Sequence, residues 1–215
     1  RDFTPRYNPW DQRVCLVPDA DLFQAIKKGR ASVVTDQIES FTESGIKLKS
    51  GQELAADIIV TATGLTLEVL GGLQVVVDGK PIDFAQTLSY KGMMYSDVPN
   101  FASCFGYTNA SWTLRADLTC QYVCRLLNHL DAQGYAQATP RNRDPDMQTQ
   151  PLLDFSSGYI QRAVARFPKQ GTRAPWRTYQ NYLLDILSLK LGAVADQALE
   201  LSHPRPATPP PPRAP

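Results

Sequence analysis

The stretch DIIVTATGL, residues 57–65, decides how the rest of the sequence is interpreted. It opens on a continuous apolar run at residues 58–60 and then changes to small and polar residues around Thr63 and Gly64. An uninterrupted apolar run is typical of a strand that is covered on both faces. Glycine permits backbone conformations and close approaches that a side chain would block. The stretch therefore predicts a buried strand that ends in a tight turn at Thr63 and Gly64.

The spacing of apolar residues changes along the chain. Short segments bounded by turn residues dominate the first half, whereas apolar residues at helical spacing dominate after Thr108. The fold class is therefore α/β or α+β, and we take it as α/β with a helical C-terminal region. The expected elements are a helix over 19–30, strands over 31–42 and 45–54, a hairpin over 73–82 turning at Asp78-Gly79, a long helix over 111–134, a polar loop over 136–157, and helices over 157–167 and 177–189.

Composition excludes several classes of function. The formal net charge is +1 over 215 residues, so no basic surface points to nucleic acid. No apolar run approaches the roughly 20 residues that span a bilayer, and no signal peptide is recognisable, so we expect a cytoplasmic protein without a membrane span. Its cysteines are expected to stay reduced there; they are Cys15, Cys104, Cys120 and Cys124.

Common catalytic and metal-binding motifs are missing from the sequence. It contains no GxGxxG, GxxxxGK[ST], GxSxG or HExxH pattern, and only two histidines. Cys120 and Cys124 stand four residues apart on the expected long helix, where they could share a metal ion. Because no cysteine or histidine partner lies nearby, buried thiols are favoured instead. We expect no metal site.

Two local clusters are candidates for a functional site. Arg13, in NPWDQRVC, either pairs with Asp11 or stacks on Trp10 as a structural residue, or serves as a functional cation. The segment GYTNASWTL, 106–114, leads into the long helix, whose first turn has free N–H groups and the positive end of the helix dipole. Such a helix start can bind an electron-rich ligand edge, or it can be an ordinary cap made by Asn109 or Ser111.

Six sequence segments, taken in order, resemble segments of one known protein family. The chain is similar to the C-terminal half of bacterial flavin-dependent monooxygenases of the Baeyer–Villiger and flavin-containing group, and most of all to the ethionamide-activating type. The resemblance runs from about residue 3 to about residue 202. The segments that carry it are FTPRYNPWDQR, VPDADLF, DIIVTATGL, YKGMMYSDVPN, GYTNASWTL and PKQGTRAPWR.

The resemblance implies a fold with two dinucleotide-binding domains, in which an NADPH domain interrupts an FAD domain. Residues 1–56 would be the end of the NADPH-binding domain, and residues 57–202 the C-terminal half of the FAD-binding domain. Residues 203–215, rich in proline, are expected to form a disordered tail. The glycine motifs that bind both cofactors would lie in an N-terminal half missing from this sequence. The chain alone is therefore expected to be incomplete and inactive.

The resemblance also implies chemistry. With FAD, NADPH and O₂, such an enzyme inserts one oxygen atom into a ketone to give an ester, or oxidises a sulfur compound, through a peroxyflavin. Arg13 aligns with the family's catalytic arginine, whose charge stabilises the anionic species. The cofactor-binding residues implied on this chain lie at the turn after the strand and at the helix start; they are Thr63, Gly64, Asn109, Ala110, Ser111, Trp112 and Thr113.

Two alternatives stay open from the sequence. A related flavin disulfide reductase would have a similar sheet but normally a redox cysteine pair, which Cys120 and Cys124 match poorly. A non-catalytic fragment would instead bind a partner through its proline-rich tail in polyproline form.

Overall fold

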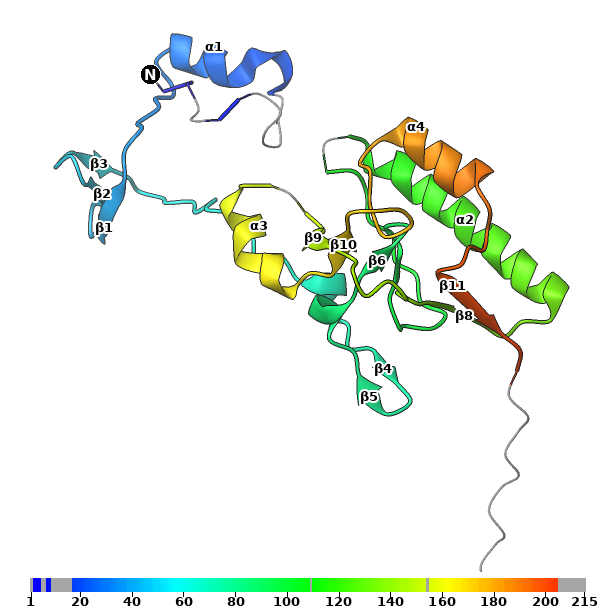
Figure 1. Ribbon diagram of the computed structural model, residues 1–215. Coiled ribbons are helices and arrows are strands. Elements are labelled where there is room, and N and C mark those ends of the chain that lie inside the picture. Colours follow the sequence, from blue (N-terminus) through cyan, green and yellow to red (C-terminus); the bar gives the residue numbers. More distant parts are fainter. Residues whose placement is uncertain (1, 5–6, 9–16, 109, 154, 205–215) are drawn as a thin grey trace, which may run out of the picture. The chain divides into compact units, whose positions relative to one another are not determined.

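The computed structural model describes residues 2–4, 7–8, 17–108, 110–153 and 155–204 (Figure 1). The chain divides into two compact units, Arg1–Leu65 and Thr66–Pro215, which we describe one at a time. Both mix helix and strand, as the sequence predicts at this coarse level. None of the helices among the described residues has the length and apolar character needed to cross a membrane.

The first unit holds one short helix and a small sheet. A 3-10 turn η1 (Pro18–Ala20) leads into α1 (Asp21–Lys27), which confirms the predicted helix. Strands β1 (Ile38–Thr42), β2 (Gly45–Leu48) and β3 (Glu53–Ala55) pair antiparallel in that order. Gly45 has no room for a β-carbon, which would collide with the carbonyl oxygen of Leu54. The predicted strand over 31–42 begins only at Ile38.

The predicted buried strand over 57–65 is wrong for this structure. The stretch has no strand assignment, and Ile58 and Val60 are 83% and 84% exposed. An apolar run becomes a buried strand only where neighbouring strands and covering layers are present, and no described strand pairs with this one. The predicted tight turn at Thr63 and Gly64 is not observed either, although Gly64 adopts a positive φ of 110° that glycine accommodates readily.

The second unit is organised around α2 (Trp112–Gln133), the helix that its periodicity predicts. Gly134 ends it with a φ of 69°, as expected for a left-handed C-cap. One face of α2 contributes Leu118, Tyr122 and Leu126 to the main core. From other elements that core takes mainly Leu88, Tyr90, Met93, Met94, Trp176, Leu189 and Leu199.

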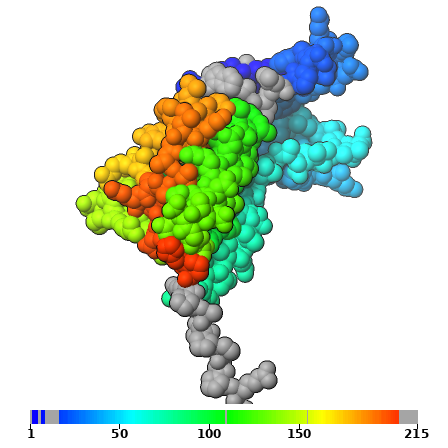
Figure 2. Space-filling model, turned by 90° about the vertical axis from the view of Figure 1, so that its right-hand side faces the viewer, coloured from blue at the N-terminus to red at the C-terminus, as the bar shows by residue number. Residues whose placement is uncertain are grey.

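The C-terminal region packs along α2. Figure 2 shows α4 (Tyr182–Asp185) and the π-helical turn η5 (Ile186–Leu191), in orange, lying against α2 in green. The predicted helix over 177–189 starts only at Tyr182 because Asn181 caps it, accepting hydrogen bonds from the backbone N–H groups of Leu183 and Leu184 at 3.0 and 3.2 Å. The predicted loop over 136–157 contains strands β8 (Gln137–Pro140) and β9 (Thr149–Pro151). Strand β8 pairs antiparallel with β11 (Leu199–Ser202).

Short elements complete this unit. The hairpin of β4 (Val76–Val77) and β5 (Lys80–Pro81) turns at Asp78 and Gly79, whose φ angles of 50° and 79° fit the predicted type I′ turn. The predicted helix over 157–167 is observed as an α-helix followed by a 3-10 turn. The remaining elements are η2 (Val69–Gly72), η3 (Phe84–Gln86), β6 (Ser89–Tyr90), β7 (Met94–Tyr95), α3 (Gly158–Ala163), η4 (Val164–Arg166) and β10 (Lys169–Gly171).

Candidate functional site at the start of helix α2

The segment before α2 folds back onto the first residue of the helix. Gly106 lies so close to the Trp112 indole that a β-carbon at this position would overlap the ring. The Phe105 ring packs against the same indole, with centroids 5.1 Å apart. A glycine is therefore required where the chain approaches the helix start, and Trp112 keeps 46% of its surface exposed there.

The residue at the N-cap of α2 does not cap the first turn with its side chain. Ser111 occupies the N-cap position in an extended conformation, yet its side chain makes no capping hydrogen bond. The Ser111 hydroxyl instead shares a hydrogen bond of 2.8 Å with the hydroxyl of Thr113. Ala110 and Thr113 are exposed at the same place. The N–H groups of a first helical turn and the helix dipole together favour an electron-rich ligand at this end of α2.

The structure brings only some of the predicted site residues together. Four of the five at the helix start lie together, namely Ala110, Ser111, Trp112 and Thr113. Thr63 and Gly64 belong to the first unit, where both are exposed. Asn109 and Arg13 lie outside the described residues, and so does most of the tail over 203–215.

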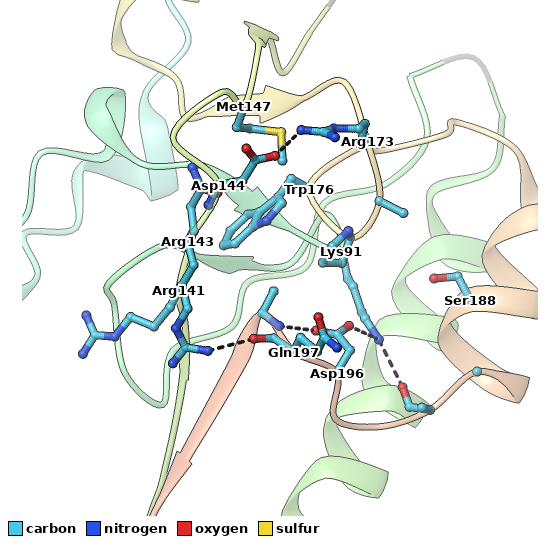
Figure 3. Close-up of a pocket in the computed structure, with 16 residues that line it drawn as sticks. Lys91, Arg141, Arg143, Asp144, Met147, Arg173, Trp176, Ser188, Asp196 and Gln197 are labelled. Carbon is cyan, nitrogen blue, oxygen red and sulfur yellow. Dashed lines mark hydrogen bonds and ion pairs between the residues drawn. The ribbon is translucent and has the colours of Figure 1, made fainter.

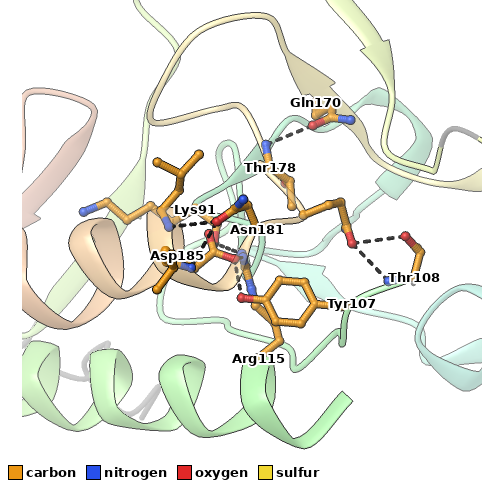
Figure 4. A network of polar contacts seen from close by, with 11 residues as sticks. Lys91, Tyr107, Thr108, Arg115, Gln170, Thr178, Asn181 and Asp185 are labelled. Atoms are coloured by element: carbon orange, nitrogen blue, oxygen red, sulfur yellow. Dashed lines mark hydrogen bonds and ion pairs between the residues drawn. The ribbon is translucent and has the colours of Figure 1, made fainter. Parts of the chain in front are cut away.

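A buried ion pair fixes the first turns of α2 to α4. Arg115 and Asp185 form a salt bridge, with side chains 3% and 5% exposed (Figure 4). The Tyr107 hydroxyl donates to the same carboxylate at 2.6 Å, and the guanidinium lies 5.8 Å from the centre of the Tyr107 ring. Burial raises the pKa of Tyr107, and the bond to Asp185 raises it further, so the phenol stays protonated and donates.

The second terminal nitrogen of the Arg115 guanidinium binds the turn between β6 and β7. Arg115 donates to the Lys91 carbonyl oxygen at 2.8 Å. Lys91 and Gly92 are the central residues of this hairpin turn, with φ angles of 50° and 70°. A β-carbon at Gly92 would collide with the Arg115 side chain. The left-handed glycine thus serves both the turn and the close approach of the cation.

A second contact joins the C-terminal region to the segment before α2. The Gln180 side-chain oxygen accepts from the Thr108 backbone N–H at 3.0 Å and from the Thr108 hydroxyl at 3.1 Å. Gln180 directly precedes Asn181, the cap of α4. The residues just before α2 and those of its first turn are therefore both held by one short stretch, 180–185.

Sequence reasoning missed this network, although a signal was present. Arg115 stands on the same helical stripe as Leu118, Tyr122 and Leu126, at spacings of three and four residues. A charged residue on the apolar face of a helix needs a buried counter-ion. Asp185, which interrupts the apolar run of residues 183–187, is that counter-ion.

One hydroxyl beside this network has no hydrogen-bond partner among the described residues. The Thr178 Oγ1 atom is buried and unpaired, whereas the Thr178 backbone N–H donates to Gln170 at 2.9 Å. A buried hydroxyl without a partner costs about 1–3 kcal/mol. We expect Thr178→Val to leave the thermal midpoint unchanged or to raise it by a few degrees. Thermal unfolding followed by circular dichroism measures this, and a drop of more than about 5 °C would show that the hydroxyl is bonded.

A separate groove of about 760 Å³ lies beside Trp176 and Met147 (Figure 3). Its charged side chains are already matched. Lys91 pairs with Asp196 at 3.4 Å, and burial lowers the Lys91 pKa while Asp196 opposes that shift. Each arginine around the groove has a carboxylate partner: Arg141 pairs with Asp97, Arg143 with Glu200, and Arg173 with Asp144. This balance leaves no excess charge to indicate a ligand.

The cysteines differ from expectation in their burial. Cys120 and Cys124 are exposed rather than buried, and both are free thiols. No group of three or more potential metal ligands occurs within the described ranges. Burial raises the pKa of the Cys104 thiol, and neighbouring Cys120 raises it further, so neither effect activates this thiol.

Comparison with known proteins gives a consistent picture. The chain is 51% identical over 207 residues to FAD-containing monooxygenase EthA of Mycobacterium tuberculosis, covering 96% of this chain and 42% of that protein. It is 48% identical to EthA of Mycolicibacterium smegmatis with the same coverage, and 50% identical over 200 residues to "Probable FAD-binding monooxygenase AlmA" of Acinetobacter baylyi, covering 93% of this chain and 40% of AlmA. No protein-family model and no solved structure matches.

The matched relatives have similar names, and the chain covers a similar share of each. The chain spans about two fifths of the length of each, and the match includes nearly all of its own residues. The matched 207 residues include most of both units, so the match is not confined to one of them. The chain belongs to the FAD-containing monooxygenases, as the counterpart of the C-terminal part of these proteins.

Proposed function

We propose that this chain contributes the C-terminal part of an FAD- and NADPH-dependent monooxygenase. The reaction inserts one oxygen atom from O₂ into a ketone, giving an ester, or oxidises a sulfur compound. The observation that carries the proposal is the 51% identity to an FAD-containing monooxygenase over 96% of the chain. The activity and substrates of the whole protein go beyond this similarity and are part of the proposal.

The start of α2 is the proposed contact with the flavin ring. When bound, FAD reduced by NADPH would activate O₂. The chain would hold the pyrimidine edge of the ring with the N–H groups that follow Ser111, whose own side chain does not cap them. Ala110, Trp112 and Thr113 surround these donors, and Asn109 would complete them. The sequence has no glycine-rich phosphate loop, so the fit extends to the ring edge and not to the phosphates.

The exposed stretch over 57–65 fits the same proposal. We propose that it becomes a parallel strand once neighbouring strands of an FAD domain lie beside it, with Thr63 and Gly64 turning next to the cofactor. Residues 1–56 would then belong to an NADPH domain and residues 57–202 to the FAD domain. The exposure of Ile58 and Val60 supports this, because a stretch of that composition loses water favourably on pairing.

A chimaera tests the proposed reaction. The matching 207 residues of EthA from M. tuberculosis are replaced by this chain. We expect the purified chimaera to consume NADPH and O₂ and to convert a simple ketone to its ester, or a sulfide to its sulfoxide, with product identified by mass spectrometry. Native EthA is the positive control. A folded chimaera that holds FAD but yields no oxygenated product from either class would contradict the proposal.

A further inference from the structure

The contact between Gln180 and Thr108 holds the segment that leads into α2. One oxygen accepts two hydrogen bonds from the same residue, from its backbone N–H at 3.0 Å and from its hydroxyl at 3.1 Å. A backbone N–H bound in this way fixes the direction of the peptide plane. The plane belongs to the chain three residues before the N-cap Ser111, so the contact also limits how the helix start is oriented.

Gln180 is itself held in an unusual backbone conformation. Its φ is 51°, in the left-handed region that residues with side chains seldom occupy. Such a conformation is unfavourable and persists only where the surroundings impose it. Here Asn181 caps α4 immediately afterwards, and Asp185 anchors the same helix to Arg115. The side-chain oxygen of Gln180 is thus presented to Thr108 from a firmly held backbone.

The two links between 180–185 and the start of α2 differ in burial. Asp185 is buried with Arg115, and its loss removes a charge partner from the core. Gln180 and Thr108 are half-buried, and their hydrogen bonds contribute far less to stability than the buried ion pair does. Substituting Gln180 should therefore alter the orientation of the helix start while changing the stability of the fold little.

We propose that Gln180 is a positioning residue that aligns the start of α2 against the flavin ring. This inference rests on the proposed function, because it assigns the flavin edge to the same helix start. Gln180 does not touch the reacting atoms. It acts through Thr108, and so its loss should leave cofactor uptake intact while lowering the fraction of activated oxygen that reaches substrate.

The first test uses this chain as it stands. Amide hydrogen exchange is measured over residues 104–116 in the wild type, Gln180→Leu, Gln180→Glu and the control Gln161→Leu, whose lost bond is to the Phe155 carbonyl oxygen. We expect Gln180→Leu to speed exchange at the Thr108 amide on the order of tenfold. Gln180→Glu keeps the accepting oxygen and should stay near wild type, as should Gln161→Leu. Unchanged exchange at Thr108 in Gln180→Leu would overturn the proposed positioning.

The second test uses the EthA chimaera and measures oxygenated product formed per NADPH consumed. We expect Gln180→Leu to retain FAD and to lower this ratio severalfold, with the lost oxygen recovered as hydrogen peroxide. Gln180→Glu should restore most of the ratio, which a merely structural role would not require. If the unsubstituted chimaera binds no FAD, the proposed function fails, whatever the exchange result. If it is active and Gln180→Leu keeps its product ratio, the proposed function stands and this inference is wrong.

Discussion

Replacing Asp185 with alanine is expected to lower the free energy of unfolding of the Thr66–Pro215 unit by about 3–5 kcal/mol. The substitution leaves the Arg115 guanidinium, only 3% exposed, without its counter-charge. It also removes the acceptor of the Tyr107 hydroxyl. Breaking a buried pair costs far more than the pair's net stabilisation, because one charge remains desolvated.

Urea unfolding followed by circular dichroism measures this loss, and urea has the advantage of not screening charges. For a unit of this size, the expected drop in thermal midpoint is roughly 6–20 °C. Asp144→Ala is the matched control, since it breaks an ion pair whose arginine, Arg173, is 62% exposed. That variant should lose about 1 kcal/mol or less. Equal losses in the two variants would show that Arg115 and Asp185 do not form a buried pair.

Arg13→Ala in the EthA chimaera is expected to lower the rate of substrate oxygenation by on the order of a hundredfold or more. The family resemblance gives Arg13 the role of a fixed cation that stabilises negative charge in the reaction. FAD uptake should persist, because nothing in the sequence connects Arg13 with phosphate binding. NADPH oxidation should continue, with oxygen released as hydrogen peroxide.

Two further variants distinguish this role from simple loss of charge. Arg13→Lys should restore little activity, because an ammonium does not reproduce the planar fork of donors. Arg30→Ala, which removes an exposed arginine just after α1, should leave product formation near that of the chimaera. Normal oxygenation by Arg13→Ala would return Arg13 to a structural role beside Trp10 or Asp11.

The parts of the fold that were predictable depend on local signals. The apolar stripe and terminal glycine of α2, and the Asp78-Gly79 turn, are encoded within a few residues of where they act. Such elements need no knowledge of distant segments. The strand β8 is different, because its pairing with β11 joins residues about sixty positions apart, and its own four residues, Gln-Ala-Thr-Pro, include no large apolar side chain to mark a strand.

The failure at 57–65 has the same physical origin. Its composition indicates a preference for burial in a sheet, but burial requires neighbouring strands, and the described residues supply none. The network around Arg115 was missed for a related reason. The pairing of Arg115 with Asp185 spans seventy residues, so the sequence shows that a counter-ion is needed without showing which residue provides it.

The most direct test of the central claim is a measurement of flavin content after gel filtration. We expect the chain alone to retain no FAD, because it lacks a phosphate-binding glycine loop. The EthA chimaera should retain about one FAD per chain, seen in its visible absorbance. That result would support the chain as the C-terminal part of an FAD-dependent monooxygenase. Stoichiometric flavin on the chain alone, or a folded chimaera without flavin, would contradict it.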